Sequence, residues 1–473
     1  MKPSEANAII DPGETMYEFV RSHESSARTY ASAIDVVIER GEGTAVFDTA
    51  GRRYLDFLMC AGTLATGHNH PVILERVQRF LQSGHVMQVL DITTPAKHDF
   101  LARLLECLPA PWASRARVQF CGPTGADAIE AALKLFKTAT GRRSVIAFHG
   151  AYHGMTAGAL ALTGNLSAKR HVASLMPDVY FMPFPYAYRC PFGLGGKLTS
   201  QVSLAYIERA LSDPESGIPH PAAMVVEVVQ GEGGVIPASL DWLRGLRQLT
   251  ARLDIPLIID EVQTGIGRTG TMFAFEAAGI EPDAVVISKA IGGGFPMSLV
   301  VYDSKYDVWQ SGAHAGTFRG NQIAMAAGTA CLDVIRDEQL VAAAYAKGDY
   351  LGARLTELAA QYPMIGEVRG RGLMWGLEIV DPAAAPDSLG SHPANREMAL
   401  ALKRRCLRLG LILENGGRYG AVLRMLPPLN VALREIDEAV DILAQAMKEA
   451  TDEPRPVPQQ VRRRTPEGKL LRL

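Results

Sequence analysis

Short β-rich runs alternate with helical patterns from about residue 116 to residue 302. The runs are ARVQF, SVIAF, DVYFM, AAMVVEVV, PLIID, AVVIS and SLVVY. Such alternation is typical of a mostly parallel sheet that helices cover on both faces. The pattern therefore predicts an α/β fold for this part of the chain.

Two amphipathic segments in this region predict helices. Residues 125–140 are expected to form one helix, which Gly141 is suited to end. Its apolar stripe comprises Ile129, Ala132, Leu133 and Phe136. A second helix is expected after Ser239. Its stripe comprises Trp242, Leu246, Leu249 and Leu253.

The chain has 473 residues, more than one hydrophobic core usually serves, so we expect more than one domain. The β-rich runs place a large domain over residues 61–330. Ala- and Leu-rich helical segments, interrupted by GEVRGRGLMWGLEIV and AVLRMLPPL, favour a smaller α+β domain over residues 331–450. Residues 1–60 are expected to pack with the smaller domain. Residues 451–473, with several prolines and no apolar periodicity, are expected to form a flexible tail.

Composition narrows the class of function. Hydrophobic residues make up 48% of the chain and charged residues 21%, as in ordinary globular proteins. The net charge of −2 offers no attraction for nucleic acid or an anionic membrane. The chain has neither an apolar N-terminal run nor a membrane-length apolar stretch, which favours the cytoplasm. The six scattered cysteines form no Cys-x-x-Cys pair, so we expect no metal site.

Lys289 stands between a buried strand and a glycine-rich turn in AVVISKAIGGGFP. A strand end fixes the backbone, and the small residues after it leave room for a bulky ring. Apolar surroundings also lower the pKa of an amine, so that it can attack an aldehyde. A lysine at a strand end is by itself more often a solvated side chain, so this interpretation depends on the residues that accompany it.

Asp260 ends the run PLIID, and its motif contains no basic neighbour that would explain it as a surface ion pair. A carboxylate in this position keeps a pyridine ring protonated, and the cationic ring withdraws the electrons left when a substrate C–H bond breaks. Gln263 is placed to donate to an oxygen of the same ring. The alternatives are a turn-forming aspartate and an exposed loop glutamine.

The segment CGPTGADAIEAALKLFK offers a helix N-terminus for a phosphate, because its free N–H groups and its dipole favour an anion. Gly125 permits close approach, and Thr124 is either a helix cap or a phosphate ligand. In FHGAYHGMT, Tyr152 is either a core residue or an aromatic face that stacks on a cofactor ring. Together with Lys289 and Asp260, these residues predict a cofactor site.

These motifs, in this order, resemble those of the class III, ornithine-type aminotransferases over roughly residues 25–450. The similar segments are PTGADAIEAALKL, FHGAYHGMT, EVVQGEGG, IIDEVQTGIGRTG, SKAIGGGFP and GTFRGN. The resemblance implies a fold-type I pyridoxal 5′-phosphate (PLP) enzyme, whose large domain holds the cofactor on a mostly parallel seven-stranded sheet. It also implies a homodimer with its active sites at the subunit interface.

The resemblance assigns roles to single residues. Lys289 looks like the imine-forming lysine, Asp260 like the partner of the pyridine nitrogen, and Gln263 like a contact to the ring oxygen. Gly125 and Ala126 look like phosphate ligands.

Further roles follow from the same resemblance. Tyr152 is expected to cover the ring face, and Thr317 in GTFRGN to reach the phosphate of the neighbouring subunit's cofactor. Several family members pair a glutamate of the QGEGG motif with a late arginine, here Glu232 and Arg424. Such a pair masks the arginine from a terminal amine substrate and releases it for glutamate. Without the family, the two would be separate surface charges.

Several segments look closer still to those of the diaminobutyrate–2-oxoglutarate aminotransferases, among them GTLATGHNHP, VLDITTPAK, PYAYRCPFG and TFRGNQIAMAAG. Many ornithine- and 4-aminobutyrate-type members have an arginine after the His-Gly of the tyrosine motif, where this chain has Met155. Losing that guanidinium contact forfeits roughly a few kcal/mol for a carboxylate placed there. Arg319 and Lys169 are candidates for holding the second carboxylate of 2-oxoglutarate.

The chain is thus expected to move the terminal amino group between L-2,4-diaminobutyrate and 2-oxoglutarate, giving aspartate 4-semialdehyde and glutamate reversibly. Another ω-aminotransferase, acting on 4-aminobutyrate, ornithine or a related amine, is the nearest alternative. An inactive regulatory homologue is less favoured, because Lys289, Asp260 and the phosphate loop are all present.

Overall fold

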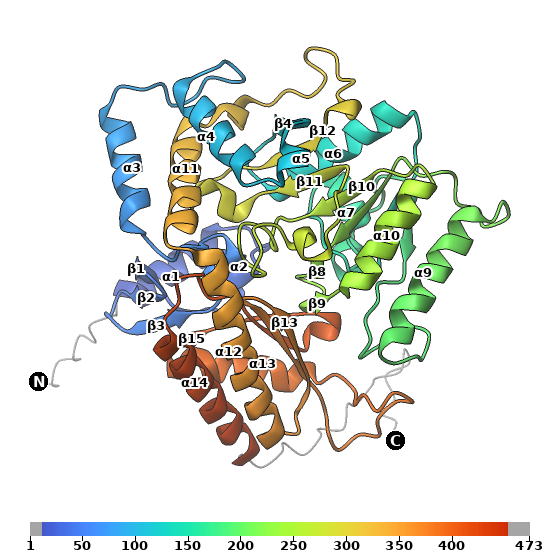
Figure 1. Ribbon diagram of the computed structural model, residues 1–473. Helices are drawn as coiled ribbons and strands as arrows, with labels where there is room; N and C mark the ends of the chain where they lie inside the picture. Colours follow the sequence, from blue (N-terminus) through green and yellow to red (C-terminus); the bar gives the residue numbers. More distant parts are fainter. Residues whose placement is uncertain (1–11, 453–473) are drawn as a thin grey trace, which may run out of the picture.

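The computed structural model describes residues 12–452 and shows one large sheet with helices packed around it (Figure 1). Of the expected tail, only Thr451 and Asp452 belong to the described part of the chain, where they end a helix. The rest of that tail and residues 1–11 of the N-terminal segment lie outside the described residues.

The central sheet has seven strands in the order β4-β12-β11-β10-β7-β5-β6. They are β4 (Ala116–Phe120), β5 (Val145–Phe148), β6 (Val179–Met182), β7 (Ala223–Glu227), β10 (Leu257–Asp260), β11 (Ala284–Ile287) and β12 (Leu299–Asp303). β12 runs in the opposite direction to the other six strands of this sheet. All seven β-rich runs contribute a strand, which confirms the α/β fold. The run AAMVVEVV differs in one respect, because it breaks after Glu227 and continues as β8 (Val229–Gln230), which pairs with β9 (Ile236–Pro237).

Both faces of the central sheet are covered, because successive strand residues point to opposite sides. In β10, Leu257 and Ile259 belong to the same buried cluster as Trp242 of α10 (Leu240–Arg252). Ile258 belongs instead to a cluster with Ile129 of α6 (Gly125–Thr140). The uniformly apolar strands follow from this arrangement, since neither face meets water.

Local signals set the ends of α6 and α10. Thr124 caps α6, whose end at Gly141 adopts the left-handed φ of 67° that glycine tolerates best. The Ser239 hydroxyl accepts a hydrogen bond from the backbone N–H of Trp242 at 3.2 Å and so begins α10. Both predicted helices are confirmed.

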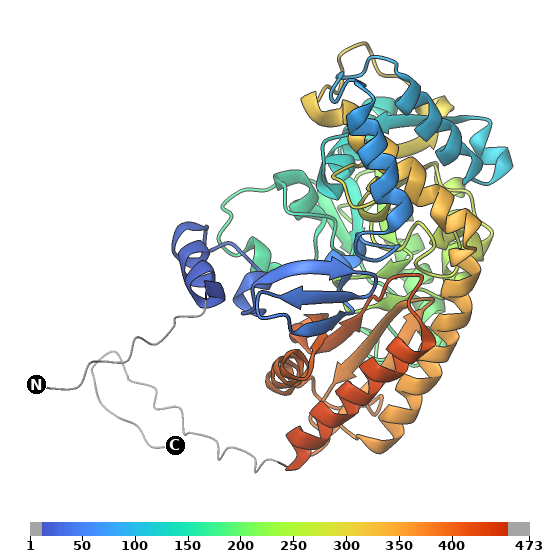
Figure 2. The ribbon, with the colours of Figure 1, turned by 90° about the vertical axis from the view of Figure 1, so that its left-hand side faces the viewer.

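A second sheet lies in the C-terminal part of the chain, in the order β13-β14-β17-β16. Its antiparallel strands are β13 (Ile365–Arg371), β14 (Met374–Ile379), β16 (Glu414–Gly416) and β17 (Val422–Met425). Three helices accompany it, namely α12 (Leu340–Gln361), α13 (Arg396–Leu409) and α14 (Leu433–Asp452). Figure 2 shows α12 and α14 side by side at the base of the molecule.

A third sheet brings an N-terminal segment together with a C-terminal strand. It contains β1 (Ile38–Glu42), β2 (Ala45–Asp48), β3 (Arg53–Asp56) and β15 (Leu411–Ile412). β3 and β15 pair in parallel, so residues near position 55 lie beside residues near position 411. The exact division of the chain into domains stays a prediction.

The remaining helices complete the outer layer. The longer ones are α1 (Pro12–His23), α3 (Pro71–Gln82), α4 (Pro95–Glu106), α9 (Lys197–Ser212) and α11 (Gln322–Asp337). The short ones are α2 (Met59–Gly62), α5 (Ala110–Ala113), α7 (Ala157–Leu162) and α8 (Leu166–Lys169). Among residues 12–452, no helix has both the length and the apolarity needed to cross a membrane. The same residues contain no cluster of His, Cys, Asp and Glu suited to a metal ion.

Candidate active site

A cavity of about 510 Å³ opens where several strands of the central sheet end. Asp260 ends β10, and Lys289 follows β11, the parallel neighbour of β10. The cavity brings together eight of the residues predicted from the sequence. They are Thr124, Gly125, Ala126, Tyr152, Glu232, Asp260, Gln263 and Lys289.

Lys289 begins the short 3-10 helix η3 (Lys289–Gly292) with a φ of 53°, a left-handed conformation unusual for a residue with a side chain. Such strain persists where the surrounding structure holds a functional side chain in place. Burial lowers the pKa of the Lys289 amine, although the charges of Glu232 and Asp260 oppose this shift. A larger fraction of the amine is therefore neutral and able to act as a nucleophile.

Asp260 is paired with a histidine. The imidazole Nδ1 of His153 lies 2.7 Å from Asp260 Oδ2, and both side chains are almost fully buried. Burial alone would lower the pKa of His153, but the hydrogen bond and charge of Asp260 outweigh it, so the net shift is upward. The other carboxylate oxygen accepts a hydrogen bond from the backbone N–H of Val262 at 3.0 Å. These contacts fix the orientation of the Asp260 carboxylate.

A second buried carboxylate, Glu227, supports the same region from the neighbouring strand β7, where it stands opposite Asp260. It accepts hydrogen bonds from the backbone N–H groups of Tyr152 at 3.0 Å and Gly231 at 2.9 Å. Burial raises the pKa of Glu227. Because it holds the loops that carry Tyr152 and Glu232, Glu227 positions two walls of the cavity.

The N-terminus of α6 forms one end of the cavity. Thr124 and Asp127 form a reciprocal capping box, in which Thr124 N donates to Asp127 Oδ2 at 2.9 Å. Gly125 is tightly placed, because a Cβ atom there would lie 2.9 Å from the side chain of Val262. The cap uses the N–H of Asp127, so the N–H groups of Gly125 and Ala126 are those that would receive an anion at this end. Thr124 is thus a helix cap. This position is also next to the proposed phosphate site, so the cap does not exclude the role of phosphate ligand.

Two polar side chains complete the walls. Gln263 Nε2 donates to the backbone oxygen of Ala61 at 3.1 Å, while its Oε1 is buried and has no hydrogen-bond partner among the described residues. Tyr152 is 36% exposed and so presents part of its ring to the cavity that it lines. Burial, followed by the charge of Glu232, raises the pKa of its hydroxyl.

Glu232 and Arg424 form a bidentate ion pair, with Nη1–Oε1 and Nη2–Oε2 distances of 2.7 and 2.9 Å. Arg424 comes from β17, and its side chain is only 1% exposed. Burial alone would lower the pKa of Arg424, but the negative charge of Glu232 opposes this effect and the net shift is upward. Glu232 lines the cavity and Arg424 does not, so the glutamate masks the arginine behind it. The two are not separate surface charges.

Of the other predicted residues, one lines this cavity and three do not. Met155 lines the cavity. Thr317, in η5 (Thr317–Gly320), is exposed and is not among the lining residues. Arg319 is already paired with Asp91. Lys169 lines a different cavity and donates to a backbone oxygen at 2.9 Å. Neither Arg319 nor Lys169 therefore reaches the cofactor cavity in this structure.

Two residues at the centre of the site were missed from the sequence. His153 directly follows Tyr152 in FHGAYHGMT, and Glu227 is an acidic residue inside the apolar run AAMVVEVV. A charge within a buried strand is unusual and needs a partner, so Glu227 offered a signal. His153 offered none, because its contact with Asp260 joins residues 107 positions apart.

Comparison with known proteins agrees with this geometry. The family described as aminotransferase class-III matches residues 26–447. A diaminobutyrate–2-oxoglutarate aminotransferase of Rhizobium meliloti is 53% identical over 425 residues, covering 90% of each chain. A protein of the same name from Haemophilus influenzae is 47% identical and covers 90% of this chain and 93% of its own.

Solved structures show the same relationship. A PLP-bound amine transaminase from an uncultivated Pseudomonas species superposes with a TM-score of 0.80 at 27% identity, over 90% of this chain and 97% of its own. An (S)-enantioselective ω-transaminase from Thermomicrobium roseum gives a TM-score of 0.82 at 27% identity, over 93% and 99% of the two chains. The fold, the cavity and these similarities together establish that the chain belongs to the class III, PLP-dependent aminotransferases.

Proposed function

We propose that this enzyme moves the terminal amino group between L-2,4-diaminobutyrate and 2-oxoglutarate. The observation that carries the proposal is Met155, which lines the cofactor cavity. Many ornithine- and 4-aminobutyrate-type members have a carboxylate-binding arginine at this position, and methionine cannot form that salt bridge, which makes 4-aminobutyrate a poorer donor. The relatives named above, at 53% and 47% identity, support the same substrate pair.

The residues of the cavity fit the family's cofactor, PLP. Gly125 keeps the first turn of α6 free of a side chain, where a Cβ atom would lie 2.9 Å from Val262, and Tyr152, Asp260 and Lys289 line the same cavity. Asp260 would hold the ring nitrogen, the N–H groups of Gly125 and Ala126 the phosphate, and Tyr152 one ring face. When bound, the cofactor supplies a cationic ring that withdraws the electrons left by a broken C–H bond.

Lys289 is proposed as the group that binds the cofactor and then moves the proton. Its lowered amine pKa favours the neutral form, which is nucleophilic and also able to accept a proton. Once the substrate amine has displaced it, Lys289 Nζ would take the proton from the amine-bearing carbon of the substrate. The negative charges of Glu232 and Asp260 stabilise the protonated amine that results.

The Glu232–Arg424 pair is proposed to let one site accept two kinds of amine. With Arg424 masked, a terminal amine meets no unpaired guanidinium near its reacting carbon. Glutamate carries a carboxylate beside its amine, and this carboxylate would replace Glu232 on Arg424. The bidentate geometry suits this exchange, because either carboxylate offers the same two oxygens.

A homodimer is proposed from the exposed apolar side chains near Thr317. Five large ones are more than half exposed, and they lie on two segments that the bridge between Gln88 and Asn321 joins. They are Val86, Met87, Leu90, Ile92 and Phe318. A second copy covering this surface would bring Thr317 toward its partner's cofactor site.

All six cysteines are free thiols, which supports the proposed cytoplasmic location.

A panel of amino donors with 2-oxoglutarate tests the proposed substrate. The holoenzyme is expected to use diaminobutyrate with a higher kcat/KM than 4-aminobutyrate or ornithine. Met155→Arg is expected to raise kcat/KM for 4-aminobutyrate about tenfold or more, and Met155→Gln, which adds no charge, to leave it nearly unchanged. A wild-type preference for 4-aminobutyrate would overturn the proposal.

A further inference from the structure

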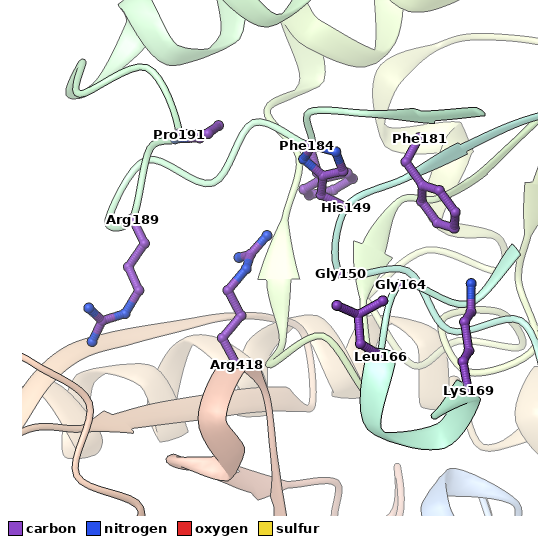
Figure 3. Close-up of a pocket in the computed structure, with 10 residues that line it drawn as sticks. All are labelled: His149, Gly150, Gly164, Leu166, Lys169, Phe181, Phe184, Arg189, Pro191 and Arg418. Atoms are coloured by element: carbon purple, nitrogen blue, oxygen red, sulfur yellow. The ribbon is translucent and has the colours of Figure 1, made fainter. Parts of the chain in front are cut away.

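A second cavity, of about 500 Å³, lies next to the cofactor cavity and shares no lining residue with it. Figure 3 shows the residues that line the second cavity. His149 and Gly150 line the second cavity, and Tyr152 lines the first, so one loop after β5 separates them. On the opposite side stands η6 (Arg418–Gly420), which directly follows Gly417. Gly417 N donates to the backbone oxygen of Glu232 at 2.9 Å, so the two cavities are neighbours on this side too.

Arg418 extends into this second cavity (Figure 3). Its Nη1 atom is buried and has no hydrogen-bond partner among residues 12–452. Its guanidinium carbon lies 4.8 Å from the centre of the Tyr186 ring, a contact that leaves the N–H donors unused. Burial lowers the pKa of Arg418. A buried guanidinium N–H group without an acceptor is unfavourable, so the Nη1 atom of Arg418 is a suitable donor to an anion in this cavity.

The lining offers Arg418 no carboxylate, since none of its ten residues is Asp or Glu. The nearby Glu378 is already engaged. It accepts hydrogen bonds from Tyr186 and Arg189 at 2.7 Å each and from Arg369 at 2.8 Å. Arg189 lines the cavity too, but its charge is balanced by this contact.

Lys169 adds a second positive charge to the lining. Its Nζ lies 4.7 Å from the centre of the Phe181 ring and donates to the backbone oxygen of Ala161 at 2.9 Å. An ammonium group has three donors, so this single hydrogen bond leaves capacity for another acceptor. The cavity therefore carries a positive field that no lining side chain neutralises.

The remaining walls are largely apolar, with Leu166, Phe181, Phe184 and Pro191 among the lining residues. We propose that this cavity is a binding site for a small organic carboxylate, separate from the cofactor cavity. The carboxylate group of the ligand would accept hydrogen bonds from Arg418 and would be attracted by the positive charge of Lys169. The carbon chain of the ligand would pack against Phe181 and Phe184. Inorganic phosphate fits less well, because it has no carbon chain to pack against the apolar walls and would lose hydration there.

Glutarate is a suitable probe, since it has a carbon chain and two carboxylates but no amino or oxo group to react. Calorimetric titration at constant ionic strength would use holoenzyme carrying Arg424→Gln, so that the arginine of the cofactor cavity does not contribute. We expect one glutarate per chain, and no comparable binding of inorganic phosphate. Adding Arg418→Gln is expected to weaken glutarate binding at least tenfold, whereas Arg404→Gln, at an exposed arginine on α13, is expected to leave it unchanged.

Leu166→Asp provides an independent variant, because Leu166 is 77% exposed and its replacement does not disturb the core. The added negative charge is expected to weaken glutarate binding by repulsion. The proposal is overturned if the Arg424→Gln holoenzyme binds no glutarate, if Arg418→Gln binds it as tightly as the Arg404→Gln control, or if phosphate binds equally well. None of these measurements requires turnover, so they are independent of the amine that the enzyme uses.

Discussion

The imidazole of His153 holds the carboxylate of Asp260 in a buried pair, with 2.7 Å between Nδ1 and Oδ2. Neither side chain reaches solvent to an appreciable extent, so each holds the orientation of the other. Because Asp260 is the proposed partner of the cofactor's ring nitrogen, the histidine acts on the cofactor only through the aspartate. His153 is therefore a positioning residue.

Removing this histidine should destabilise the protein and impair the cofactor site. His153→Phe leaves a buried carboxylate unpaired, which typically costs about 3–5 kcal/mol in the free energy of unfolding. His153→Gln keeps a hydrogen-bond donor and should recover part of the loss. Urea unfolding of the cofactor-free protein measures the effect, with the exposed His98→Phe as a control. Equal stability of the His153→Phe and control variants would contradict the described pairing.

Lys289→Ala should lower the rate of transamination by roughly 10²–10⁴-fold or more, because the variant lacks both a covalent anchor and a proton carrier. PLP should still bind noncovalently, since Asp260 and the α6 N-terminus remain. Absorbance of the dialysed protein reports bound cofactor, and a coupled assay reports turnover. The exposed Lys134→Ala variant serves as the control. Normal turnover by Lys289→Ala would rule out the assigned role.

Arg424→Gln should separate the two half-reactions. The arginine makes two charged hydrogen bonds, each worth about 1.5–3 kcal/mol, so the KM for 2-oxoglutarate should rise at least tenfold. The half-reaction with a terminal amine should change less, because the arginine is masked when that donor binds. Stopped-flow absorbance measures each half-reaction on its own. Equal losses in both would argue against the gate.

The stability of the protein should depend on the ionisation of Glu261, which is 1% exposed. Burial raises the pKa of Glu261 to about 7 from an ordinary value near 4.5. In the unfolded chain the group ionises first, so its contribution to stability is fully present below pH 4.5 and is lost as the pH rises through 7. At pH 8, the ionisation of Glu261 should lower the free energy of unfolding of the wild type by roughly 3 kcal/mol, and Glu261→Gln should not show this loss.

Urea unfolding of both proteins from pH 4.5 to pH 8 measures this difference. The stability of Glu261→Gln relative to the wild type should increase between pH 4.5 and about pH 7 and then level off. Glu75→Gln, at an exposed position, should show no such trend. A constant difference between the wild type and Glu261→Gln would mean that Glu261 does not titrate in this range.

The sequence was sufficient to predict those parts of the site that depend on strand ends. Asp260 and Lys289 follow the apolar runs of β10 and β11, and neighbouring parallel strands end at the same edge of a sheet. Both ends of α6 were equally predictable, because Thr124 at its N-terminus and Gly141 at its C-terminus carry local capping signals. Patterns of this kind depend on residues within one turn or one strand, so the amino-acid sequence displays them directly.

Contacts between distant segments could not be derived in this way. Glu232 and Arg424 are 192 positions apart, and only the resemblance to a family suggested that they pair. His153 and Asp260 meet because the loop after β5 folds over β10, which no periodicity in the sequence indicates. The buried Nη1 atom of Arg418, which has no hydrogen-bond partner among the described residues, was unforeseeable for the same reason, since its surroundings come from four separate stretches of the chain.

The central claim is that the terminal nitrogen of diaminobutyrate is the one transferred. L-2,4-Diaminobutyrate labelled with ¹⁵N only at its terminal amine can be incubated with the holoenzyme and 2-oxoglutarate, and the glutamate analysed by mass spectrometry. We predict that the glutamate carries the label in full. Unlabelled glutamate would mean that the 2-amino group is transferred, and the absence of glutamate would mean that diaminobutyrate is not a substrate; either result would contradict the claim.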